Sequence, residues 1–136
     1  MTAAVEAAIQ QVRLAFPEHT VLFLSDAQGG AAVIVEDLLI GPAFVPSESW
    51  VGFALNYTYP RSHVYPHFLR PDLARAEHKP LTSPLNPGQA MPGFERPATM
   101  LSRASNRWDP ARDTATLKLL RVLQWLREQA GMTVGA

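Results

Sequence analysis

The sequence predicts an α+β fold that consists of an N-terminal helix, a four-stranded antiparallel meander, a proline-rich segment and a C-terminal helix. Three observations predict this order. Apolar residues recur at helical spacing near both ends of the chain, β-branched runs lie between them, and eight of the twelve prolines fall between Pro60 and Pro97. The chain has 136 residues, of which 47% are apolar and 18% charged, as in a small globular domain. We therefore expect residues 1–136 to form a single domain.

The first predicted element is a helix that ends before Pro17. Its apolar residues recur three and four positions apart, which places them on one face of a helix. They are Val5, Ala8, Ile9, Val12 and Phe16. Proline disfavours helical geometry in the residue before it, so the helix should stop there.

The predicted strands are short runs of β-branched and large apolar residues. Residues 20–24 and 31–35 flank the sequence Ser-Asp-Ala-Gln-Gly-Gly, whose turn-forming residues favour a hairpin. Residues 50–55 form a third run, with Val51, Phe53 and Leu55 on one face, and residues 64–69 form a poorer fourth. The simplest arrangement of these four runs is an antiparallel meander.

The segment from Pro60 to Pro97 is predicted to be a long loop. Proline lacks the backbone N–H group that a strand ladder needs, and it interrupts helices. A loop of this length inside a compact domain is usually functional.

The last predicted element is a helix that opens at Asp109 and Pro110. An aspartate can cap a helix and a proline suits its first turn, while Asp113 adds negative charge at the positive end. Leu119, Leu120, Leu123, Leu126 and Ala130 then supply the apolar stripe. Lys118, Arg121 and Glu128 are predicted to point elsewhere, and Gly131 suits the exit of the helix.

Charge and composition exclude several classes of function. Twelve basic side chains balance twelve acidic ones, so we predict no nucleic-acid or membrane partner. No signal peptide or membrane-spanning run is present in the sequence, which favours the cytoplasm. There is no cysteine, and His63 and His67 are separated by Pro66, which argues against a helical metal site. We predict neither a metal nor a cofactor.

One segment carries a resemblance to a known family. Met100-Leu101, six further residues, and then Trp108-Asp109-Pro110-Ala111 lead into the predicted last helix. This spacing resembles the Cys-Leu, six residues, Trp-x-Pro-Ala of ubiquitin-conjugating (UBC) enzymes. Residues 57–60 (Tyr-Thr-Tyr-Pro) and 63–66 (His-Val-Tyr-Pro) are similar to the tyrosine- and proline-rich stretch of that family. The resemblance implies a UBC-like fold.

Two departures from the family pattern are plain. Met100 stands where the catalytic cysteine would be, and a thioether cannot act as a nucleophile. The family's His-Pro-Asn tripeptide is absent, because Ala90-Met91-Pro92 occupy its place and Asn86-Pro87 lie farther back. These departures are similar to those of divergent bacterial UBC-like families, which accompany an activating enzyme, a ubiquitin-like modifier and a deconjugating protease.

Serines near Met100 are the candidate nucleophiles under this resemblance. Ser102 is the nearest and is preferred, and Ser105 is the second. A serine at neutral pH is almost wholly protonated, so either would need a base such as His78, Asp109 or Asp113. Both serines are equally well explained as turn formers before Trp108.

The other residues of the segment complete the predicted neighbourhood. It comprises Met100, Leu101, Asn106, Trp108, Asp109 and Asp113. Arg103 and Arg107 flank the serines and are predicted to be solvated. Trp108, Pro110 and Trp125 are predicted to be structural.

Three hypotheses follow for the function. The first is a UBC-like component of a bacterial ubiquitin-like conjugation pathway, which receives a modifier from an activating-enzyme-like protein and carries it as an oxyester on Ser102. The second is a non-catalytic UBC-like adaptor that binds the modifier or its charged partner. The third is an unrelated α/β binding module whose match between Met100 and Ala111 is chance.

Overall fold

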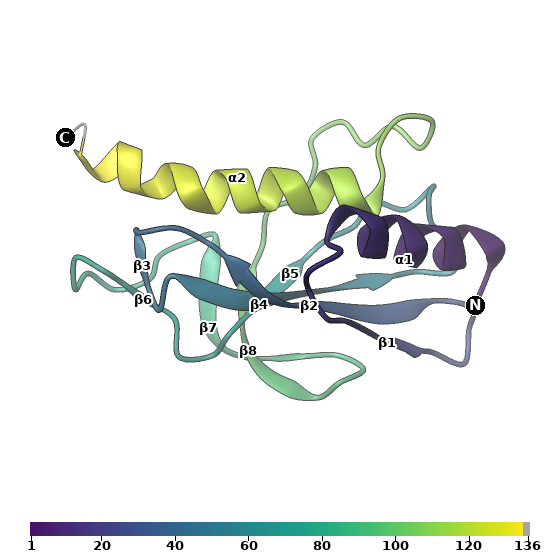
Figure 1. Ribbon diagram of the computed structural model, residues 1–136, viewed down its shortest axis with the longest axis horizontal. Coiled ribbons are helices and arrows are strands. Elements are labelled where there is room, and N and C mark those ends of the chain that lie inside the picture. Colours follow the sequence, from purple (N-terminus) through teal and green to yellow (C-terminus); the bar gives the residue numbers. More distant parts are fainter. Residues whose placement is uncertain (135–136) are drawn as a thin grey trace.

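The computed structural model describes residues 1–134, and Figure 1 shows its elements in chain order. They are α1 (Ala3–Ala15), β1 (Val21–Ser25), β2 (Ala31–Leu39), β3 (Phe44–Val45), β4 (Glu48–Leu55), β5 (His67–Leu69), β6 (Ala74–Arg75), β7 (Leu85–Met91), β8 (Arg96–Leu101) and α2 (Ala115–Val134).

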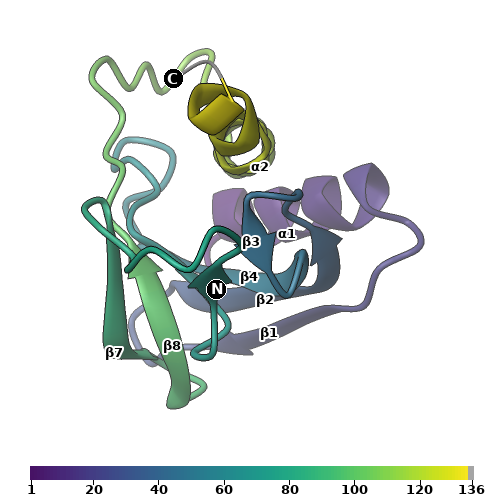
Figure 2. The same ribbon diagram turned by 90° about the vertical axis from the view of Figure 1, so that its left-hand side faces the viewer.

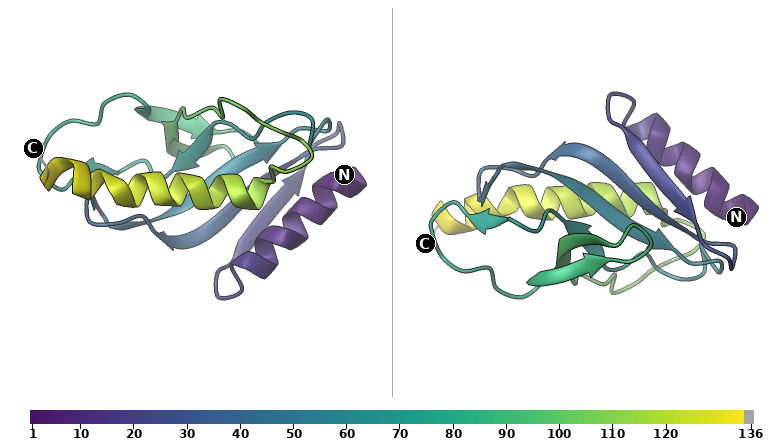
Figure 3. Two further views of the ribbon diagram at one scale, coloured as in Figure 1. Left: turned by 90° about the horizontal axis from the view of Figure 1, so that it is seen from above. Right: turned by 90° about the horizontal axis from the view of Figure 1, so that it is seen from below.

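The main sheet of residues 1–134 has six strands in the order β1-β2-β4-β5-β8-β7, and every neighbouring pair is antiparallel. Both helices lie on one face of this sheet (Figures 1 and 3). Figure 2 shows that the sheet is strongly bent, because β7 and β8 run steeply across the direction of β1 and β2. The strands β3 and β6 pair separately.

The main core fills the space between the sheet and the two helices. α1 contributes Val5, Ala8, Ile9 and Val12, all at most 2% exposed. α2 contributes the residues Ala115, Leu119, Val122, Leu123 and Leu126. Burying one such aliphatic side chain stabilises a fold by about 1.5–3 kcal/mol, so this layer holds both helices against the sheet.

A second, smaller cluster covers the opposite face of the sheet. It contains Ala32, Ile34, Phe68, Met91 and Ala98. The β7–β8 hairpin reaches back over this face, and the side chain of Met91 occupies the space where Gly52 has no Cβ. A side chain at residue 52 would therefore push the hairpin away from β4.

The structure confirms the predicted α+β class with helices at both ends and a mostly antiparallel sheet. The first helix runs to Ala15, and the Thr2 hydroxyl caps it by accepting the Val5 N–H (3.2 Å). The first three predicted strands correspond to β1, β2 and β4, although β2 is longer than predicted. Val51 and Phe53 are fully buried, as the alternation in β4 predicts.

The fourth predicted strand, residues 64–69, contains β5, but the prediction of a loop without strands over the rest of the segment from Pro60 to Pro97 is wrong. That part contains β6, β7 and the start of β8, so the main sheet has six strands in place of four. β7 is an edge strand, where a proline can be tolerated because one row of N–H groups needs no partner strand. Pro87 lies at a register shift between Asn86 and Gln89, which removes the need for its missing donor.

The predicted bounds of the last helix are also wrong. Asp109 and Pro110 belong to a separate turn, and α2 begins at Ala115. The Thr114 hydroxyl caps it by accepting the Leu117 N–H (3.1 Å). The helix continues through Gly131 to Val134, because one glycine in a helix interior costs only about 1 kcal/mol.

Within residues 1–134, no helix combines the length and the apolar character needed to cross a membrane.

Candidate functional site

The β8–α2 connection, residues 102–114, carries the serines singled out in the sequence. Two hydrogen bonds to backbone carbonyl groups hold it in place. The Ser102 N–H donates to the Pro84 carbonyl (2.9 Å), and the Trp108 indole N–H donates to the Pro60 carbonyl (2.7 Å). The connection is therefore attached to the sheet at one end and to the loop after β4 in its middle, as expected for a structural tryptophan.

A turn stabilised by two aspartates ends the connection. The Asp113 carboxylate accepts the Asp109 N–H (2.7 Å) and an N–H of the Arg121 guanidinium (2.9 Å). The hydrogen bond from the Asp109 backbone, followed by the one from Arg121, lowers the pKa of Asp113. Asp113 is thus an ionised anchor for the turn and for Arg121, which leaves it unsuited to take a proton from a serine.

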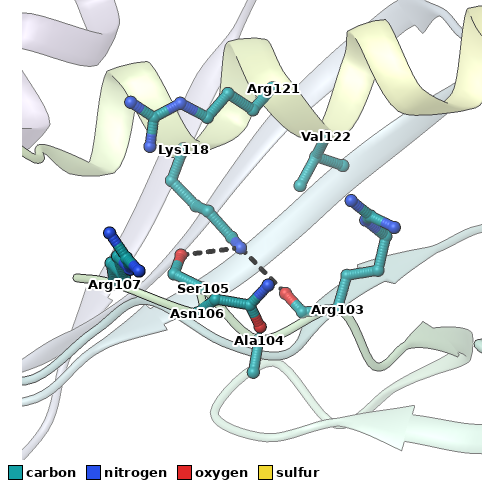
Figure 4. Close-up of a pocket in the computed structure, with 8 residues that line it drawn as sticks. All are labelled: Arg103, Ala104, Ser105, Asn106, Arg107, Lys118, Arg121 and Val122. Atoms are coloured by element: carbon teal, nitrogen blue, oxygen red, sulfur yellow. Dashed lines mark hydrogen bonds between the residues drawn. The ribbon is translucent and has the colours of Figure 1, made fainter.

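Lys118 is the unexpected residue of the site. The sequence places it on the polar side of the helix, but its residue is only 6% exposed. Its ammonium group donates to the Arg103 carbonyl (2.8 Å) and to the Ser105 hydroxyl (3.0 Å), as Figure 4 shows. Burial lowers the pKa of Lys118, the charges of Arg103 and Arg121 lower it further, and Asp113 opposes them.

A pocket of about 210 Å³ surrounds the Ser105–Lys118 pair. The β8–α2 connection forms one wall and α2 forms the other (Figure 4). Its lining residues are Arg103, Ala104, Ser105, Asn106, Arg107, Lys118, Arg121 and Val122. The Ser105 hydroxyl and the Lys118 amino group therefore line the same pocket.

The structure separates the two candidate serines. Ser105 and Asn106 line the pocket, whereas Ser102 is outside its lining, half-buried at the end of β8. Among the described residues, the Ser102 hydroxyl has no hydrogen-bond partner. The sequence prefers Ser102 because it is nearest to Met100, but the geometry favours Ser105 because only that hydroxyl contacts a base.

Met100 and Leu101 lie on β8 and not in a loop. Leu101 is fully buried in the main core, and Met100 is half-buried against the smaller cluster on the other face. Asn86 is the Cα partner of Met100 across the β7–β8 ladder. The hairpin therefore brings Asn86 beside Met100, although the two residues are fourteen apart in the sequence.

None of the histidines lines the pocket. His78 is exposed in the turn after β6, and His63 stacks on Tyr65 with ring centroids 5.5 Å apart. His67 is buried in β5, where burial lowers its pKa to about 3. Among the described residues, no group of three histidine, aspartate or glutamate side chains is arranged to hold a metal ion.

Arg103 and Arg107 are both exposed, as the sequence predicts for a solvated pair, and both line the pocket. The Arg103 guanidinium lies over the Trp125 ring, 5.0 Å from its centroid. This stacking holds Arg103 close to the pocket and covers the half-buried indole.

The arrangement is suited to acyl transfer. A buried lysine that is more easily neutral can accept the proton of an adjacent serine, and the serine oxygen can then attack an acyl group. The sequence contained a signal for Lys118, because residues 115, 118, 119 and 122 follow helical spacing on the buried face.

Comparison with known proteins finds no matching family model, no matching curated protein and no matching solved structure.

Proposed function

We propose that this chain is a UBC-like component of a bacterial ubiquitin-like conjugation pathway in the cytoplasm and that it carries the modifier as an oxyester on Ser105. One observation carries the choice of residue: the Lys118 ammonium nitrogen lies 3.0 Å from the Ser105 hydroxyl oxygen. The Ser105 oxygen forms a bond to the C-terminal carbonyl carbon of the modifier, and the bond from that carbon to its activating group breaks. The activating group leaves with the electron pair, while Lys118, as the free amine, takes the hydroxyl proton. The partners are the modifier and an activating-enzyme-like protein.

The order of elements supports the UBC-like interpretation. A first helix, antiparallel strands, a proline-rich segment and a last helix follow one another as in that superfamily. The segment from Met100 to Ala111 has the family's Cys-to-Trp spacing, and it begins at the end of β8 and continues into the β8–α2 connection. Asn86 pairs with Met100 across the β7–β8 ladder, which makes it our candidate for the role of the family's asparagine.

Mass spectrometry tests the carrier proposal directly. The full chain is incubated with its cognate activating enzyme, the modifier and ATP, and the covalent adduct is mapped. We expect a hydroxylamine-labile adduct that Ser105→Ala abolishes and Ser102→Ala retains. An adduct that survives in Ser105→Ala and disappears in Ser102→Ala would return the assignment to Ser102.

A non-catalytic UBC-like adaptor is the second candidate, and the position of Met100 favours it. This side chain fills the place of the family cysteine and packs against the smaller cluster, so nothing at that position can carry an acyl group. The adaptor predicts that the modifier binds in a titration while no covalent species accumulates with either serine intact.

A further inference from the structure

The wall of the Ser105 pocket has a strongly uneven charge. Three of its eight lining residues are arginines, Arg103, Arg107 and Arg121, and none is an aspartate or glutamate. Within the described residues, only Arg121 of these three forms a salt bridge with a carboxylate, that of Asp113. Because the whole chain has equal numbers of acidic and basic side chains, this excess is local and attracts anions.

Two of the arginines lie on the same side of the reacting pair. Figure 4 shows the guanidinium groups of Arg107 and Arg121 on one side of Ser105 and Lys118, with Arg103 on the other side. Asp113 holds Arg121 through one terminal nitrogen, at 2.9 Å, and no other residue of the described part of the chain accepts a hydrogen bond from this guanidinium, which leaves N–H groups for a ligand. Planar guanidinium groups match the oxygens of a phosphate better than any other side chain.

We propose that the acyl donor for Ser105 is an acyl phosphate, a mixed anhydride of a carboxyl group and a phosphate, whose phosphate is held by Arg107 and Arg121. This inference rests on the proposed carrier function. The Ser105 oxygen forms a bond to the acyl carbon, and the bond from that carbon to the bridging oxygen breaks. The bridging oxygen keeps the electron pair and leaves as part of the phosphate, while Lys118 takes the hydroxyl proton.

The charges explain why an anhydride with phosphate suits this site. Negative charge grows on the bridging oxygen as the bond breaks, and fixed cations nearby stabilise that charge in the transition state. A thiolate leaving group would gain less from the arginines, because it offers no set of oxygens for paired N–H donors. The pocket volume of about 210 Å³ admits the phosphate and the acyl carbon, with the remainder of the donor outside.

The test uses two small donors and the full chain. Acetyl phosphate supplies an anionic leaving group, and phenyl acetate supplies the same acetyl group on a neutral ester. Peptide mapping follows acetylation of Ser105 with time. We expect acetyl phosphate to acetylate Ser105, inorganic phosphate to compete with it, and phosphate to leave the reaction of phenyl acetate unchanged.

Arginine variants locate the phosphate subsite. We expect Arg107→Gln to slow the reaction of acetyl phosphate by about tenfold or more and to change the reaction of phenyl acetate little. Arg121→Gln should slow the reaction of acetyl phosphate by a larger factor than that of phenyl acetate, because the charge of Arg121 also lowers the pKa of Lys118. Arg121→Lys, which keeps the charge, should recover part of the loss. Arg13→Gln is the matched control, because Arg13 lies on α1 over Phe23, away from the pocket.

The outcomes separate the two proposals. If both donors acetylate Ser105 and the arginine variants slow neither, the phosphate subsite is wrong and the carrier function stands. If neither donor acetylates Ser105, or the acetyl group is found on Lys118 with Ser105 unmodified, the carrier function is wrong as well. Retained reactivity toward phenyl acetate shows that an arginine variant is folded.

Discussion

The sheet–helix core and the β8–α2 connection are adjacent in space but are stabilised in different ways. The core is apolar and buried, and residues such as Leu119 and Leu123 are at most 1% exposed. The connection is mostly exposed and is held by a few hydrogen bonds to backbone carbonyl groups. Stability therefore depends mainly on the core residues, and the candidate chemistry depends on the connection. Lys118 belongs to both regions, because it lies on α2 and donates hydrogen bonds to the connection.

Lys118→Met should have the largest effect and should separate the two regions most clearly. Removal of a general base typically slows a reaction by about 10²–10⁴-fold, so acetylation of Ser105 by acetyl phosphate should fall by that order. The free energy of unfolding should stay the same or rise, because a buried cation is replaced by an apolar chain of similar length.

Lys79→Met provides the control for this variant, because Lys79 is the other lysine of the chain and its side chain is 73% exposed. It should change neither the acetylation rate nor the urea midpoint. Equal rates of Ser105 acetylation in Lys118→Met and the unmodified chain would show that Lys118 only supports the connection.

Leu123→Ala should do the reverse. Truncating a buried leucine leaves a cavity and costs about 2–5 kcal/mol of unfolding free energy, measured by urea denaturation. The acetylation rate of the folded fraction should change little. Leu120→Ala, at a residue that is 45% exposed, should cost much less and serves as the comparison. If Leu123→Ala greatly slowed acetylation with little loss of stability, stability and chemistry would not depend on different residues.

His67 predicts how the core responds to acid. Its pKa falls to about 3, first because it is buried and second because Lys118 is near, whereas an unfolded histidine titrates near 6.5. Between these values the unfolded chain binds a proton that the folded chain does not. The contribution of His67 to the free energy of unfolding should therefore fall as the pH falls below about 6.5, by up to about 1.4 kcal/mol per pH unit.

Urea denaturation of the unmodified chain and of His67→Leu from pH 7 to pH 4 measures this contribution. Carboxylates such as Asp113 contribute to both proteins, so the difference in slope isolates His67. Identical slopes would mean that His67 is solvated or finds a partner in the folded chain.

Tyr59→Phe should have the smallest effect. The Tyr59 oxygen accepts the backbone N–H of Ala115 (3.0 Å) at the start of α2, next to the end of the connection. Loss of this acceptor should cost about 1 kcal/mol in a urea titration, because the buried N–H loses its partner. Tyr57→Phe, at a residue that is 55% exposed, should be neutral. If both variants lost the same unfolding free energy, the hydrogen bond between Tyr59 and Ala115 would contribute nothing to stability.

Local patterns explain how much of the fold the sequence predicts. α1, the first hairpin and β4 each carry their own periodicity and turn residues, so they can be predicted without knowledge of their neighbours. The β7–β8 hairpin cannot be, because its prolines are acceptable only at an edge strand and at a register shift, and both are tertiary features.

Only part of the site can be predicted from the sequence, because the rest also depends on tertiary structure. Ser102 and Ser105 are recognised from their closeness to Met100 in the sequence, but the choice between them depends on which one lines the pocket with α2. Lys118 resembles an ordinary surface lysine until Ala115 and Val122 are included in the buried face. The approach of Asn86 to Met100 depends on the strand register, which no short motif encodes.

The stacking of Arg103 on Trp125 has a practical consequence. An indole emits light with an intensity that depends on nearby charges, and this indole lies 5.0 Å from a guanidinium at the edge of the pocket. An anion that draws Arg103 toward itself would alter the emission of Trp125 without any attached dye. The protein therefore contains its own optical probe for occupancy of the pocket, and Trp125→Phe would identify the signal among those of the three tryptophans.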